Sequence, residues 1–84
     1  MNIATIFDLS IFTPTQSFHH KVQWIVVESP NGNFFIGPNH SPLVSLLKIE
    51  SQITYMLENS KEESYSVTSG IIYIKNNQAM ALLD

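Results

Sequence analysis

The fold is decided by residues 30–43, which read PNGNFFIGPNHSPL. A short apolar run, FFI, lies between two clusters of proline, glycine and asparagine. Asn31-Gly32 predicts a type I′ hairpin turn, because both central residues of that turn need positive φ. A second turn is predicted at Gly37-Pro38-Asn39, and Pro42 lacks the N–H that a strand ladder needs. The stretch therefore predicts a short strand between two turns, with His40 on the second.

The rest of the chain also alternates short strands with turns. Alternating, mostly apolar positions that share one face, typical of half-buried strands, occur at Phe7/Leu9/Ile11, Phe18/His20/Val22/Trp24/Val26, Ile53/Tyr55/Leu57 and Tyr65/Val67/Ser69. Residues 24–27 are apolar on both faces, which favours a central strand or a sheet corner. Residues 43–47 fit one helical turn or a strand, and we favour the strand. Turns are predicted at residues 59–62, 69–70 and 76–77. This pattern predicts an all-β fold, a small β-sandwich of short antiparallel strands forming a single domain over residues 1–84.

Length and composition restrict the function. A chain of 84 residues buries only about 60–65% of the surface that it exposes when unfolded, so a partner surface is expected to add stability. Four lysines, seven acidic residues and a net charge of -3 argue against binding to nucleic acid. The apolar runs are far shorter than a membrane span of about 20 residues, and the N-terminus lacks the basic region of a secretory signal. We therefore expect a soluble protein of a cytoplasm-like compartment.

The side chains do not predict catalytic chemistry. His19, His20 and His40 are the three histidines, and there is no cysteine. Neighbouring residues of a strand point to opposite faces, so His19 and His20 are not expected to bind one metal. Ser69-Gly70 lacks the context of a nucleophile elbow, and no glycine-rich phosphate loop is present. We expect no metal, no cofactor and no enzymatic activity.

The central stretch resembles a known family. Residues 34–43 align without a gap with the F-G-I-L-P-G-H-A-P-L run of the epsilon subunit of F-type ATP synthases. The matching residues are Phe34, Ile36, Pro38, His40, Pro42 and Leu43. Residues 9–14, LSIFTP, resemble the opening L-x-I-x-T-P strand, and residues 67–71, VTSGI, resemble V-S-G-G-F. Residues 77–84, NQAMALLD, resemble the closing N-x-V-T-V-L-A-D, so the resemblance covers the N-terminal β-sandwich of the family.

The chain also departs from the family pattern at several positions. Phe35 and Asn39 stand where relatives have glycine, so the two turns are expected to differ in detail. Ile49-Glu50 replaces a Pro-Gly pair, which leaves that hairpin uncertain, and Asn33 occupies a position that is commonly acidic. The 84 residues end at Asp84, where the sandwich ends, so we do not expect the helical hairpin of many epsilon subunits, nor the ATP binding and inhibition associated with it.

The resemblance implies a non-catalytic rotor subunit of the central stalk, the counterpart of mitochondrial delta. Such a subunit couples rotation of the membrane c-ring to the γ subunit and the catalytic head. The residues expected on the c-ring side are Asn31, Gly32, Asn33, Pro38, Asn39, His40, Ser41 and Pro42. Thr13 and Ser45 are expected on the γ side, and part of an apolar sheet face should be covered by γ. The expected location is peripheral, on the cytoplasmic face of an energy-transducing membrane or its matrix or stroma equivalent.

Two other classes of function stay open on the residues alone. The first is a free-standing β-sandwich module that binds a peptide or a carbohydrate. It would need a concave face with convergent aromatic groups, for which the candidates are Trp24, Tyr55, Tyr65 and Tyr73. The second is a small hydrolase or metal enzyme, which the lack of catalytic motifs disfavours.

Overall fold

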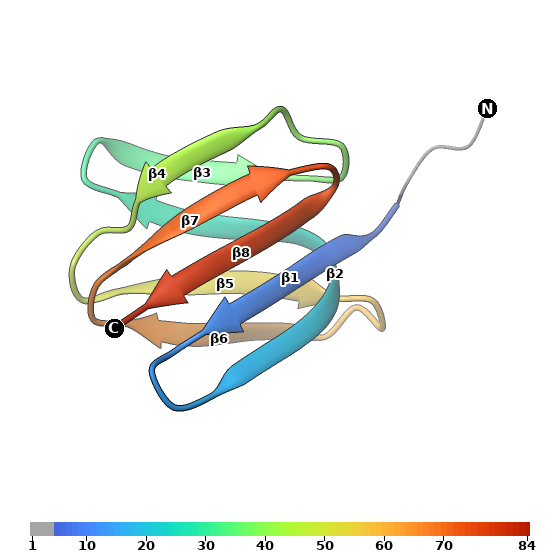
Figure 1. The fold of residues 1–84 in the computed structure, drawn as a ribbon. Helices are drawn as coiled ribbons and strands as arrows, with labels where there is room; N and C mark the ends of the chain where they lie inside the picture. The colour runs from blue at the N-terminus through green and yellow to red at the C-terminus, as the bar shows by residue number, and fades with distance from the viewer. Residues whose placement is uncertain (1–4) are drawn as a thin grey trace.

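The computed structural model describes residues 5–84, which form eight strands in two layers (Figure 1). The strands are β1 (Phe7–Phe12), β2 (Ser17–Ser29), β3 (Gly32–Ile36), β4 (Leu43–Leu46), β5 (Ser51–Leu57), β6 (Glu62–Val67), β7 (Gly70–Lys75) and β8 (Gln78–Leu83). Their order is β4-β7-β8-β1-β2-β5-β6, with β3 paired to β2. In Figure 1 the strands β4, β7, β8 and β1 lie in front of β3, β5 and β6. The predicted all-β sandwich is confirmed, and so is the strand at residues 43–46.

The long strand β2 joins the two layers. Its residues 17–22 pair with β1, and its second half pairs with β5 on one side and β3 on the other. One continuous strand thus forms the corner at which the sheet folds over on itself. The apolar residues 24–27 predicted a central strand or a sheet corner, and β2 is both, because its residues 25–27 pair on each side.

A β-bulge in β2 reverses which side chains point inward. The register against β5 shifts between Val22 and Trp24. Val22 is buried before the bulge, and Ile25 and Val27 are buried after it. Trp24 and Val26 lie on the outer side and are only half-buried. The prediction that one face continues from Val22 to Trp24 and Val26 is therefore wrong, because the extra residue of a bulge moves the period-two pattern by one position.

The strand pairings between described residues are antiparallel, as predicted, except for that of β1 with β8. These two strands run parallel, from the pair Asp8–Gln78 to the pair Phe12–Leu82. Neighbours such as β7 and β8 are joined by a tight turn, which forces an antiparallel arrangement. No such turn joins β1 to β8, and their direction could not be predicted from local sequence.

The core between the layers is mainly aliphatic. Its largest fully buried side chains are Leu9, Ile11, Ile25, Ile36, Ile53, Ile72, Ile74, Val22 and Val27. Each such side chain contributes about 1.5–3 kcal/mol through burial. Trp24 lies outside this core, and its ring packs 5.9 Å from that of Phe35 on the outer surface. Truncating Trp24 should therefore cost less than the 3–5 kcal/mol or so of a buried aromatic residue.

Asparagine forms the predicted turn between β7 and β8. Asn76 and Asn77 have φ values of 53° and 59°, and the flanking residues Lys75 and Gln78 are paired. Two central residues with positive φ define a type I′ turn, whose twist matches that of the strands it joins. The hairpin at residues 76–77 is thus confirmed.

Candidate interaction surfaces

The first predicted partner-binding segment is the turn between β2 and β3. Ser29 pairs with Gly32, so Pro30 and Asn31 are the central residues of the turn. Gly32 has a φ of 134°, whereas Asn31 has no positive φ. The predicted type I′ turn centred on Asn31-Gly32 is therefore wrong, because the ring of Pro30 holds φ near −65° at the first central position. Ser29 Oγ donates to the Gly32 carbonyl over 2.6 Å, and Asn31, Gly32 and Asn33 are all exposed.

The second predicted segment, Pro38 to Pro42, lies in the loop that joins β3 to β4. Asn39 has a φ of 60°, and its N–H donates to Asn77 Oδ1 over 2.7 Å. His40 Nδ1 lies 2.7 Å from the carbonyl oxygen of Ser41. A carbonyl only accepts, so this contact places the donated proton on Nδ1. The ring of His40 is therefore held against the backbone of the next residue, Ser41, with Nε2 as the remaining polar atom.

These two segments lie at opposite ends of β3 (Figure 1). A five-residue strand spans about 16 Å, so the two turns are not parts of one tip. Among the described strands β3 pairs only with β2, which leaves its other edge unpaired. A partner that touches both turns would therefore lie along this free edge.

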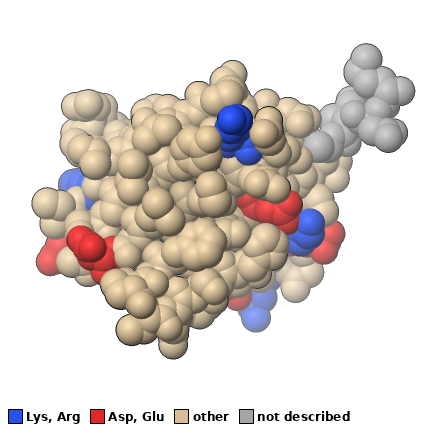
Figure 2. Space-filling model, viewed as in Figure 1, with Lys and Arg blue, Asp and Glu red and all other residues tan. Residues whose placement is uncertain are grey.

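An apolar face covers the outer side of the layer formed by β4, β7, β8 and β1. The cross-strand register aligns two rows of outward side chains, Leu46–Ile71–Leu82–Phe12 and Val44–Tyr73–Met80–Ser10. Leu46 is 67% exposed and Leu82 is 49% exposed. Figure 2 shows this side of the molecule, where most of the surface is uncharged and a few basic and acidic groups interrupt it. A monomeric surface rarely carries so many adjoining apolar side chains without a partner.

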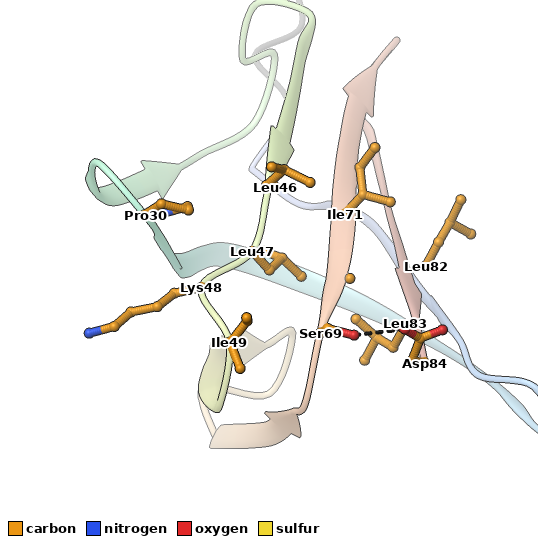
Figure 3. Close-up of a pocket in the computed structure, with 11 residues that line it drawn as sticks. Pro30, Leu46, Leu47, Lys48, Ile49, Ser69, Ile71, Leu82, Leu83 and Asp84 are labelled. Carbon is orange, nitrogen blue, oxygen red and sulfur yellow. Dashed lines mark hydrogen bonds between the residues drawn. The ribbon is translucent and has the colours of Figure 1, made fainter.

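A groove of about 920 Å³ opens at one end of this face (Figure 3). It is lined by Pro30, Leu46, Leu47, Lys48, Ile49, Ser69, Gly70, Ile71, Leu82, Leu83 and Asp84. The Lys48 side chain extends away from the groove, whereas Ser69 Oγ donates to Asp84 Oδ2 over 2.7 Å. An apolar floor with one engaged carboxylate at its end suits the apolar side chains of a partner segment.

The predicted γ-side residues flank the apolar face. Thr13 follows Phe12 and Ser45 precedes Leu46, and these two apolar residues end the first row. Thr13 Oγ1 donates to the Gln16 carbonyl over 3.2 Å, and Ser45 Oγ donates to the Leu46 carbonyl over 3.0 Å. Both hydroxyl groups are thus engaged within the chain. The apolar neighbours of Thr13 and Ser45 offer the larger contact, and the sequence reasoning did not name them.

An ionic cluster on β1 and β2 bounds the same layer. Lys21 Nζ lies 2.7 Å from Asp8 Oδ1, and His19 Nε2 lies 3.4 Å from the same atom. The hydrogen bond from Lys21 lowers the pKa of Asp8 below its ordinary value, and partial desolvation opposes this effect. The carboxylate of Asp8 in turn raises the pKa of Lys21. The charges of this cluster are therefore largely neutralised within the chain.

The four aromatic residues considered for a peptide or carbohydrate site do not converge. Tyr55 is buried, and its ring stacks on His20 with centroids 5.1 Å apart. Tyr65 packs against Phe18, Trp24 lies on the outer side of β2, and Tyr73 lies on the opposite layer. Burial, followed by the nearby Glu63 carboxylate, raises the pKa of Tyr55. The aromatic side chains therefore do not provide a shared binding face.

The described residues also bear on metal binding and on membrane insertion. Residues 5–84 contain no group of three histidine or acidic side chains arranged to hold a metal ion. That same part of the chain contains no helix with the length and hydropathy needed to cross a bilayer. The apolar face, the groove and the free edge of β3 are therefore the surfaces from which a function can be argued.

Comparison with known proteins identifies the family. The model of the ATP synthase delta/epsilon chain β-sandwich domain matches residues 6–84. The chain belongs to this family. It is 38% identical over 84 residues to the ATP synthase epsilon chain of Clostridium kluyveri, covering 98% of this chain and 62% of that one. The epsilon chain of Lactiplantibacillus plantarum is 31% identical over 78 residues, covering 90% of this chain and 55% of that one. The chain thus spans less than two thirds of the length of these epsilon relatives.

Solved structures share the fold of this ATP synthase domain. A chain in the mitochondrial ATP synthase of Euglena gracilis, solved with OSCP, F1 and c-ring, superposes with a TM-score of 0.88 at 15% identity, covering 99% of this chain and 53% of that one. A chain of the Tetrahymena thermophila central stalk and c-ring structure gives 0.74 at 11% identity, covering 90% of this chain and 61% of that one. The family match confirms the predicted resemblance to the epsilon chain of ATP synthase.

Proposed function

We propose that this chain couples rotation of the c-ring to the γ subunit and the catalytic head of an F-type ATP synthase. The observation that carries the proposal is the uncharged apolar face on a domain of the delta/epsilon family. Residues 1–84 act as one domain in this proposal, at the cytoplasmic face of an energy-transducing membrane or its matrix or stroma equivalent. The subunit transmits torque and performs no chemistry itself.

The γ subunit covers the apolar face in this proposal. The row Leu46–Ile71–Leu82–Phe12 crosses four strands, and the groove continues it at one end. Burial of apolar area yields about 25 cal/mol per Å² before the costs of association. Thr13 and Ser45 border this contact.

In this proposal the c-ring binds a second surface, which, unlike the apolar face, is polar and rich in backbone groups. It comprises the free edge of β3 with the turns that bear Asn31, Gly32, Asn33 and the loop Pro38 to Pro42. These residues carry no charge apart from that of His40 when protonated. Neutral hydrogen bonds of about 0.5–1.5 kcal/mol each would hold the contact, and it should depend only weakly on salt.

Torque transmission requires that the two surfaces belong to one stiff body. The two layers share β2, and the aliphatic core fills the space between them. Close-packed cores of this kind deform little and transmit strain. A load applied at the edge of β3 would thus reach the apolar face without a hinge.

The test compares two exposed apolar residues on opposite layers. Leu46 is 67% exposed on the apolar face, and Phe35 is 64% exposed on the outer side of β3. Leu46→Asp in the full-length protein should weaken binding to the cognate γ subunit by at least about 2 kcal/mol, because a buried unpaired carboxylate is costly. Phe35→Asp is the matched control and should bind γ with nearly the affinity of the wild-type protein. Equal binding of γ by both variants and the wild type would contradict this role of the face.

A further inference from the structure

Asn77 links three separate segments at one end of the sandwich. Its Oδ1 accepts a hydrogen bond from the N–H of Asn39 over 2.7 Å. Its Nδ2 donates to the carbonyl of Ile6 over 3.3 Å, and its own carbonyl accepts from the N–H of Asp8 over 3.4 Å. One residue in the β7–β8 hairpin therefore holds both the β3–β4 loop and the start of β1.

The β3–β4 loop has few other attachments. Pro38 and Pro42 have no N–H to donate, and His40 bonds to the adjacent Ser41. Within residues 5–84, the bond between Asn39 and Asn77 is the one hydrogen bond that ties loop residues 37–42 to another element. The position of the loop thus depends on Asn77 more than on its own backbone.

The chemistry of asparagine suits this position on two counts. Asn77 has a φ of 59°, which asparagine tolerates better than most residues do. Its amide supplies an acceptor and a donor on one short side chain, and this orientation satisfies both Asn39 and Ile6. Glycine would keep the backbone but lose both bonds, and aspartate would keep only the acceptor.

We propose that Asn77 is a positioning residue that transmits load between the c-ring loop and the γ-binding face. This inference rests on the proposed function. The hairpin of Asn77 joins β7 and β8, which bear Ile71 and Leu82 of the apolar face, and its side chain holds the loop that presents His40. Asn77 therefore connects the β3–β4 loop by a hydrogen bond to the hairpin whose strands bear the apolar face.

The first measurement is hydrogen exchange of the Asn39 amide in the full-length protein. Asn77→Gly should accelerate this exchange by about 2- to 10-fold, because the lost bond has a modest net strength. Asn77→Asp should keep Asn39 protected through the remaining acceptor. Asn76→Gly is the matched control, since Asn76 shares the turn at a φ of 53° and its side chain makes no hydrogen bond to residues 5–84. Unchanged exchange in Asn77→Gly would overturn the tether.

The second measurement is the number of ions pumped per ATP hydrolysed by the reconstituted complex. Asn77→Gly should lower this ratio while its thermal midpoint and its assembly with γ and c-ring stay those of the wild type. Asn76→Gly should leave the ratio unchanged. A normal ratio in Asn77→Gly, despite faster exchange at Asn39, would overturn the load-transmitting role and leave the proposed function standing. Failure of the wild-type protein to assemble with γ would instead overturn the proposed function.

Discussion

Replacement of Gly70 by alanine should damage the fold at the point where β7 meets β8. A Cβ at Gly70 would lie 2.5 Å from the Leu82 carbonyl oxygen and 3.2 Å from Leu83 Cα. Both are backbone atoms, so the contact is relieved only if one strand moves. β8 is paired on both sides, with β7 and with β1, and cannot shift without loss of register. We expect a loss of about 3 kcal/mol, the upper end of the usual cost of overpacking.

Urea unfolding followed by the fluorescence of the single tryptophan, Trp24, measures this loss. A domain of this size has a stability of about 4–12 kcal/mol, so the urea midpoint should fall by about 1–3 M. Gly37→Ala is the matched control, because its nearest contact would be a Phe35 side-chain atom at 3.9 Å. It should change stability by less than about 1 kcal/mol. The reasoning is refuted if Gly70→Ala unfolds at the wild-type midpoint, or if both substitutions cost the same.

Four further substitutions test turns and charges, mainly in the same urea assay. Glu50→Gly should add about 0.5–1 kcal/mol, because Glu50 has a φ of 56° that glycine adopts without strain; an unchanged or lower midpoint would contradict this. Gly32→Val should lower the stability by about 1–3 kcal/mol from its φ of 134° alone and should impair ion pumping. Asn33→Ala should leave stability and ion pumping nearly unchanged. If Asn33→Ala impaired them and Gly32→Val did not, the c-ring surface would be misplaced. The pKa of Asp8 is lowered by Lys21, so its stabilising effect is present at neutral pH and is lost as pH falls below about 4. Asp8→Asn should flatten that acid-side loss, and an identical pH profile in both proteins would show that the ion pair adds nothing.

Local patterns predicted the strands well because burial imposes a period of two on each one. Phe7, Leu9 and Ile11 are all buried on β1, as the alternation indicated. The bulge beside Gln23 could not be predicted, because both registers place apolar residues inside when residues 24–27 are all apolar. The choice is made by pairing with β5, more than twenty residues away.

The turn predicted at Asn76-Asn77 was right and the turn predicted at Asn31-Gly32 was wrong, for a physical reason. At Asn76-Asn77 no neighbour restricts the backbone, and the predicted turn forms with two positive φ values. At Asn31-Gly32 the preceding Pro30 takes the first central position and moves the turn back by one residue. Proline fixes φ covalently, whereas the preference of asparagine for positive φ is weak, so proline decides the register.

The candidate surfaces were only partly predictable. The residue pattern placed Asn31 and His40 at opposite ends of one short strand, and the bounds of β3 confirm this. It could not show that β3 pairs only with β2 among the described strands and so lies at an edge. The apolar row from Leu46 to Phe12 follows from three cross-strand registers, one of them the unexpected parallel pair. Such a row has no signature in any single segment, because each strand contributes one or two outward side chains.

A cryo-EM map of the intact complex that contains this chain tests the central proposal most directly. It should place the γ subunit over the outer side of β4, β7, β8 and β1, with Leu46 and Leu82 buried in the contact. It should also place the polar loops of the c-ring along the free edge of β3, within reach of Asn31 and His40. A map in which the apolar face is exposed, or in which γ contacts the side that bears Trp24 and Phe35, would contradict the proposal.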